Sequence, residues 1–234
     1  MAIATYADVG WARVERPIKV MVIDTGVYRD HFLFKNSNIK CPIDVDCIDT
    51  HGHGTAMTSL VLFGELDHNH KPMSPVCDRV ELISCNYLPH GVNADRFYEL
   101  CLESALKEEV QFVSFSSTSE VYMTAEHEAL LRMAERKIKF VTAMGNEGQD
   151  VRKYKMFPAV LSLLAPLKET VIPVMGKTRS GERWSLSNYG IPAAVELSVS
   201  VRSAIPAGVG YGSGTSQATA LHTNRLLNEA CKIP

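Results

Sequence analysis

The chain has 234 residues, a length that fits one α/β domain with a single large hydrophobic core. Hydrophobic residues make up 46% of the chain and charged residues 21%, and the formal net charge is −2. This composition is typical of a globular protein, and it lacks the basic excess that nucleic acids and anionic membranes attract. We therefore expect neither a nucleic-acid partner nor a membrane partner.

The elements follow a regular alternation. In chain order, the patterns predict a strand over residues 18–23, a helix over 55–63 and a strand over 80–85. A helix is then expected after Asn93, followed by a strand over 111–115 and a helix over 123–136. Strands over 137–143, 171–175 and 195–201 come next, and a helix over 216–230 ends the chain.

Alternating strands and helices predict an α/β fold, with a mostly parallel central sheet and helices on both faces. We expect a three-layer sandwich formed by one domain over residues 18–234, preceded by an N-terminal extension over residues 1–17. Functional sites of such sheets lie at the carboxyl ends of the strands. Asp24 and Asn146 both follow a predicted strand. The irregular stretches 28–49, 64–79 and 150–170 are expected as surface loops near that edge.

The compartment is predicted from the N-terminus. No apolar run approaches the roughly 18 residues of a membrane-spanning helix, and residues 1–17 lack the basic start and apolar stretch of a secretory signal. We therefore expect a cytoplasmic protein whose cysteines are thiols. A disulfide between Cys41 and Cys47 remains an alternative, whereas the absence of a CxxC spacing argues against structural zinc. The six cysteines are Cys41, Cys47, Cys77, Cys85, Cys101 and Cys231.

Three short segments supply a carboxylate, an imidazole and a hydroxyl in that order: residues 24–26 (Asp-Thr-Gly), 52–55 (Gly-His-Gly-Thr) and 214–218 (Gly-Thr-Ser-Gln-Ala). A fourth segment, 145–148 (Gly-Asn-Glu-Gly), supplies a side-chain amide. Each segment alone has a simpler interpretation: Ser216 as a helix N-cap, or Asp24 and Asn146 as turn residues. Together, and in this order, they resemble the subtilisin-like serine protease (subtilase) family from about residue 18 to residue 230.

The resemblance implies a role for each of these side chains. Ser216 would be the nucleophile and His53 the general base that activates it. Asp24 would orient the imidazole, and Asn146 would donate to the oxyanion together with the backbone N–H of Ser216. His51 is a competing base, but in the family the catalytic histidine directly precedes Gly-Thr and opens a helix, which selects His53.

The resemblance also implies a substrate-binding region. Residues 112–117 resemble the strand that pairs with the substrate backbone and lines a specificity pocket, and residues 184–190 and 157–159 match further family segments. Thr118 and Ser119 stand where a glycine pair is usual, and Met144 is larger than the residue usual there. We expect a small or medium apolar residue before the cut bond. The expected substrate-binding residues are Ser116, Ser117, Thr118, Ala143, Met144 and Gly145.

Metal binding is not expected to be required. Asp44, Asp46 and Asp49 form a candidate cluster for a hard cation, but no calcium loop can be identified. The segment 67–70 (Asp-His-Asn-His) contains ligand-type residues but is more typical of a solvated loop. We expect no metal and no cofactor.

Serine endopeptidase activity is the expected function, with a protein or peptide as substrate. Two alternatives use the same fold: a peptide ligase or macrocyclase that excludes water from the acyl-enzyme, and a catalytically silent binding module. About 17 residues precede the first predicted strand, too few for the family's usual propeptide, so a regulatory protein partner is a further candidate.

Overall fold

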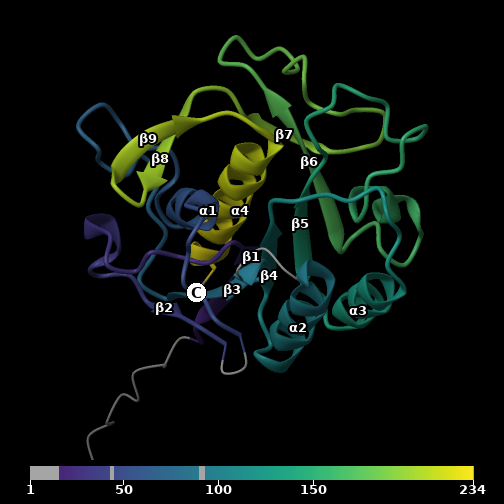
Figure 1. Ribbon diagram of the computed structural model, residues 1–234, viewed down its shortest axis with the longest axis horizontal. Helices are drawn as coiled ribbons and strands as arrows, with labels where there is room; N and C mark the ends of the chain where they lie inside the picture. Colours follow the sequence, from purple (N-terminus) through teal and green to yellow (C-terminus); the bar gives the residue numbers. More distant parts are fainter. Residues whose placement is uncertain (1–15, 43–44, 90–92, 234) are drawn as a thin grey trace, which may run out of the picture.

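The computed structural model describes residues 16–42, 45–89 and 93–233 (Figure 1). Most of the expected extension over residues 1–17 and Asp44 of the acidic segment lie outside the described residues. In chain order the elements are β1 (Ile18–Asp24), η1 (Phe32–Phe34), β2 (Ile39–Lys40), α1 (His53–Phe63), β3 (Val80–Asn86), α2 (Ala94–Lys107), β4 (Phe112–Phe115), α3 (Thr124–Glu135), β5 (Lys139–Ala143), η3 (Ala159–Leu163), β6 (Val171–Lys177), β7 (Ala194–Leu197), β8 (Val201–Ile205), β9 (Gly208–Gly212) and α4 (Thr215–Cys231).

A seven-stranded sheet forms the centre of the molecule, in the order β2-β3-β1-β4-β5-β6-β7. Each pair of neighbouring strands in it is parallel. β8 and β9 form a separate antiparallel hairpin. Since β1 lies between β3 and β4, the chain first builds the sheet on one side of β1 and then on the other. Such a reversal opens a crevice at the carboxyl ends of the strands.

Helices cover both faces of the sheet, because successive strand residues point to opposite sides. Met21 and Ile23 of β1 pack in one core with residues of α2 and α3. Val20 and Val22 belong to a second core with residues of α1 and α4. In Figure 1, α2 and α3 lie together, as do α1 and α4, and residue contacts join the helices of each pair. The predicted α/β sandwich is confirmed.

Several predicted bounds differ from those observed, and two of these differences have a clear local cause. α1 begins at His53 rather than residue 55, because Gly52 and Gly54 weaken the helical signal at its start. The strand predicted over 195–201 is divided into β7 and the first residue of β8. Ser200 between them has a φ of +52°, which is incompatible with an extended chain. β9 escaped prediction because glycine occupies alternate positions, 208, 210 and 212.

The expectation of reduced thiols is wrong in this structure, where all six cysteines form disulfides: Cys41–Cys47, Cys77–Cys231 and Cys85–Cys101. The first of these is the alternative that the sequence left open. The other two depend on tertiary packing, since one joins residues 154 positions apart and the other joins β3 to α2. Among the described residues, no helix is both long and apolar enough to cross a membrane.

Candidate active site

Asp24 and His53 meet at the carboxyl end of the sheet. Asp24 is the last residue of β1, and His53 is the first residue of α1. The buried Asp24 accepts a hydrogen bond of 2.7 Å at Oδ1 from His53 Nδ1, and a second one from the backbone N–H of Thr25. A carboxylate can only accept, so Nδ1 carries the proton and Nε2 is left as the free acceptor. The negative charge of Asp24 is the main cause that raises the pKa of His53 above its ordinary value.

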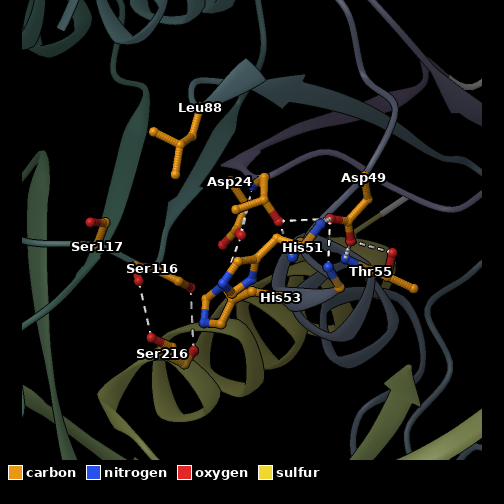
Figure 2. Close-up of polar contacts among 12 residues, drawn as sticks. Asp24, Asp49, His51, His53, Thr55, Leu88, Ser116, Ser117 and Ser216 are labelled. Carbon is orange, nitrogen blue, oxygen red and sulfur yellow. Dashed lines mark hydrogen bonds and ion pairs between the residues drawn. The ribbon is translucent and has the colours of Figure 1, made fainter. Parts of the chain in front are cut away.

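The carboxylate of Asp49 joins the turn after β1 to the start of α1 (Figure 2). Its Oδ1 accepts from the hydroxyl of Thr25 at 2.9 Å and from the backbone N–H groups of His51 and Gly52. Its Oδ2 accepts from both the backbone N–H and the hydroxyl of Thr55. Burial opposes ionisation of Asp49, but these hydrogen bonds outweigh burial and lower its pKa. The carboxylate therefore fixes the N-terminus of α1 against the turn after β1.

Glycine at position 54 permits the close approach of the two segments. A Cβ there would lie 2.1 Å from the carbonyl oxygen of Gly26, well inside van der Waals contact. The backbone N–H of Gly54 donates to the hydroxyl of Thr25 at 2.8 Å. Only glycine fits between the start of α1 and the turn after β1.

Ser216 lies in the first turn of α4, and the His53 ring projects from α1 toward it in Figure 2. The Ser216 hydroxyl donates to the carbonyl oxygen of Ser116 at 3.0 Å, and the Ser116 hydroxyl donates to the carbonyl oxygen of Ser216 at 3.3 Å. No hydrogen bond joins Ser216 to His53 among the described residues. Rotation about the Cα–Cβ bond of Ser216 is needed to direct its hydroxyl toward Nε2, and such bonds are often loose before a substrate binds.

Asn146 supplies an amide beside the start of α4. Its Oδ1 accepts from the backbone N–H of Thr215 at 2.8 Å and from the Thr215 hydroxyl at 3.0 Å. The NH₂ group therefore remains for an external acceptor, and the Asn146 side chain is exposed. The first N–H groups of a helix have no acceptor within that helix, so the N–H of Ser216 is a second donor on the same side.

Asn188 holds the segment that carries Asn146. Its fully buried amide donates to the carbonyl oxygen of Met144 and to Glu147 Oε2, and its Oδ1 accepts from the backbone N–H groups of Glu147 and Gln149. The sequence placed Asn188 in a matching segment without a role. The signal for such a role is the residue type: an Asn side chain has both donors and acceptors and can form hydrogen bonds with backbone N–H and C=O groups that lie beyond the end of a strand.

The remaining sequence-predicted residues divide into two groups. Ser116 is nearly buried beside Ser216, while Ser117 and Thr118 line a cavity of about 180 Å³. Ala143, Met144 and Gly145 are buried, and Met144 packs in a small core of its own. Glycine at position 145 allows the side chain of Asn188 to approach the backbone of this segment, because a Cβ there would lie 2.5 Å from Asn188 Nδ2.

The candidate cation ligands are engaged in other interactions. Asp49 uses both oxygens within the α1 junction, and Asp46 accepts from the backbone N–H of Ile48. In the segment 67–70, Asp67 accepts from the backbone N–H groups of Asn69 and Lys71 and so closes a turn. The described residues contain no group of three or more His, Cys, Asp or Glu side chains arranged to hold a metal ion.

Comparison with known proteins agrees with this geometry. The model of the Subtilase family matches residues 15–226. A search of curated proteins finds no match. Among solved structures, a cold-adapted subtilisin-like serine proteinase is 20% identical, with a TM-score of 0.76, and the match covers 93% of this chain and 77% of that chain.

Two further solved structures share the fold. The patellamide maturation protease PatA is 18% identical with a TM-score of 0.72, covering 91% of this chain and 78% of its own. The A-subunit of the AB5 toxin from E. coli is 21% identical with a TM-score of 0.71, covering 94% of this chain and 80% of its own. At these identities the likeness establishes the fold.

Proposed function

Because the chain belongs to the subtilase family, we propose that it is a serine endopeptidase with Asp24, His53 and Ser216 as its catalytic triad and Asn146 in its oxyanion hole. The observation that carries the proposal is the 2.7 Å hydrogen bond between Asp24 and His53. It fixes the tautomer in which Nε2 accepts a proton. The ring projects toward Ser216, the residue that matches the nucleophile of the family motif.

The reaction begins when the Ser216 hydroxyl turns from the Ser116 carbonyl to His53. His53 Nε2 takes its proton as Oγ bonds to the substrate carbonyl carbon, and the electron pair of the carbonyl moves to oxygen. The resulting oxyanion is stabilised by the amide of Asn146 and the N–H of Ser216. His53 then gives its proton to the leaving amine, and an acyl-enzyme remains.

Deacylation repeats these steps with water. His53 removes a proton from the water as its oxygen attacks the acyl carbon, and the proton returns to Ser216 Oγ as the acid product leaves. Asp24 stays ionised throughout and stabilises the imidazolium. No step requires a metal or a cofactor.

Labelling with a fluorophosphonate tests the proposal. The wild-type protein should be labelled at Ser216, and Ser216→Ala should not be. Asn146→Ala should lower the labelling rate about 100- to 1,000-fold, corresponding to about 2.7–4 kcal/mol of lost oxyanion stabilisation. A folded wild-type protein that resists labelling would contradict the proposal and favour the silent binding module.

Product analysis separates hydrolysis from ligation. An endopeptidase releases two linear fragments and incorporates ¹⁸O from labelled water into the new carboxylate. A ligase or macrocyclase transfers the acyl group to an amine and incorporates no ¹⁸O. We propose a protein or peptide as the substrate, with no nucleic acid or membrane involved, and we keep a regulatory protein as a candidate partner.

The compartment is a separate part of the proposal. The sequence predicts the cytoplasm, where thiols are kept reduced, but three disulfides are typical of oxidising compartments. We infer that the protein works where these disulfides persist. The redox state of its cysteines in the native host decides between the two locations.

A further inference from the structure

The cavity of about 180 Å³ beside the candidate site contains a buried carboxyl group that the proposed mechanism does not use. Glu126 of α3 lines this cavity and is 3% exposed. Its Oε1 accepts a 2.6 Å hydrogen bond from the hydroxyl of Tyr98. Oε2 has no hydrogen-bond or ion-pair partner among the described residues. One oxygen of a nearly buried carboxyl group is thus left for a ligand.

The other lining groups suit a cation with an apolar stem. Tyr98 stacks on Phe115 at 4.5 Å between ring centroids, and Tyr87 meets Phe115 edge-on at 5.8 Å. Aromatic faces attract cations as well as methylene groups. Asp95 adds a second carboxylate, and none of the described residues that line the cavity is Lys, Arg or His.

The cavity lies where an extended peptide bound at Ser216 would pass. Ser117, Thr118 and Ser119 line it, and they directly follow Ser116, whose carbonyl oxygen contacts the Ser216 hydroxyl. The hydroxyls of Tyr87 and Ser117 are joined by a 3.2 Å hydrogen bond. Since an extended chain advances about 3.3 Å per residue, a peptide side chain roughly two to four residues from the cut bond would reach the cavity.

We propose that Glu126 makes this cavity a specificity pocket for a Lys or Arg side chain of the peptide substrate. The inference rests on the proposed endopeptidase function and adds to it a second selection, separate from the apolar residue expected before the cut bond. The cationic head pairs with Glu126 Oε2, and the stem lies along the cavity wall to which Tyr87 and Phe115 contribute. A volume of about 150 Å³ is enough to hold benzene, so one long side chain fits.

Burial favours the neutral form of the Glu126 carboxyl and raises its pKa from 4.5 to about 7, while the hydrogen bond from Tyr98 opposes this shift. A bound cation would favour the charged form. At neutral pH the Glu126 carboxyl of an empty pocket is therefore only partly ionised, and a bound cation completes its ionisation.

Cleavage of a proteome-derived peptide library, read by mass spectrometry, tests the selection. The wild-type protein should show Lys and Arg enriched at one position two to four residues from the cut. Glu126→Gln keeps the acceptor for Tyr98 but removes the charge, and should lower that enrichment about tenfold. The matched control is Glu120→Gln, which removes the same charge from an exposed residue outside the lining. It should keep the wild-type profile.

Direct binding gives a readout that does not depend on catalysis. We expect n-butylguanidinium, and not its neutral isostere n-butylurea, to shift NMR signals of the cavity residues in Ser216→Ala. Adding Glu126→Gln should weaken this binding about tenfold. Equal binding of the two compounds, or an unchanged cleavage profile in Glu126→Gln, would overturn the inference while leaving the endopeptidase proposal intact. Selective binding without any labelling or cleavage would support the cation pocket and overturn the proposed function.

Discussion

The side chains of Thr25 and Asp49 are joined by a buried hydrogen bond of 2.9 Å. Thr25 directly follows the proposed orienting carboxylate Asp24, and Asp49 also binds the N-terminus of α1, where His53 begins the helix. The two members of the Asp24–His53 pair are therefore held by one shared support in addition to their own hydrogen bond. We propose that Asp49 is a positioning residue, which acts on His53 through the backbone at the start of α1.

Replacing Asp49 should impair the site without touching Ser216. In Asp49→Asn the NH₂ group cannot accept the bonds that Thr55 donates, so α1 shifts and the fluorophosphonate labelling rate falls at least about tenfold. The same change removes a charge that helps to raise the pKa of His53, so the midpoint of the pH–rate profile should also move to lower pH. The control is Asp46→Asn, an exposed residue whose side chain accepts a hydrogen bond from the nearby backbone N–H of Ile48. A lower rate with an unmoved midpoint would mean a purely structural role.

The pKa of His53 gives a second prediction. Because Asp24 raises it, the ring should titrate above pH 6.5 in the folded protein. A base must be neutral to accept a proton, so labelling should rise with pH through this value. NMR titration of the His53 ring in Ser216→Ala measures it directly, and Asp24→Asn should lower it. A ring that titrates at or below 6.5 would contradict the assigned pairing.

The sign of the accompanying stability change follows from linkage. A histidine whose pKa is raised in the folded state contributes stability that is fully present below about pH 6.5 and is lost as pH rises through the folded pKa. Asp24→Asn should therefore reduce the free energy of unfolding more at pH 6 than at pH 9.

Asn188 should act through Asn146. Asn188→Ala leaves the backbone of residues 144–149 without its buried partners, which should cost about 2–3 kcal/mol of stability and lower the labelling rate. If the rate falls because Asn146 is misplaced, the double variant with Asn146→Ala should be no slower than Asn146→Ala alone. Full additivity of the two effects would show that Asn188 has only a general structural role.

Glu126 should destabilise the protein at high pH. Its pKa is raised, so the folded state binds a proton that the unfolded state releases between pH 4.5 and about 7, and stability falls over that range. The shift corresponds to about 3 kcal/mol. Among the described residues that line the cavity, Tyr98, Tyr87 and Asp95 are the other titratable groups, and none is a cation at these pH values.

Glu126→Gln should therefore gain stability over the wild type at pH 8 and not at pH 4, measured by urea unfolding. Glu120→Gln should show the same difference from wild type at both pH values. If the difference in free energy of unfolding between Glu126→Gln and the wild type is the same at pH 8 as at pH 5, the raised pKa of Glu126 is refuted.

The disulfides predict a simple chemical measurement. Protein purified without reductant and then denatured should react with no thiol reagent, whereas six thiols should appear after reduction. Cys77→Ala should lower the free energy of unfolding by about 2–4 kcal/mol, because the bond to Cys231 closes a loop of 154 residues. Six reactive thiols before reduction would support the cytoplasmic location that the sequence predicts.

The sequence by itself determined the layered α/β architecture and the identity of the candidate catalytic groups. Apolar runs of β-branched residues indicate strands because such side chains pack well on a buried, pleated surface, and Asp24 and Asn146 lie just after two of these runs. Gly54 was visible as part of a motif, whereas the reason for it, the close approach of Gly26, appears only in the folded chain. These features depend on residues close in the chain, so the chain order preserves them.

The tertiary structure decided everything that depends on residues far apart in the chain. From the sequence, Asp49 was interpreted only as a candidate cation ligand. In the folded chain it accepts hydrogen bonds from Thr25, after β1, and from Thr55 of α1. No role for Glu126 was expected from the sequence, because an acidic residue on an amphipathic helix is ordinarily solvated. In the folded chain that carboxyl is buried, accepts a hydrogen bond from Tyr98 and lines the same cavity as the Ser117–Ser119 segment. Burial and partner choice are set by the whole fold, and no local pattern records them.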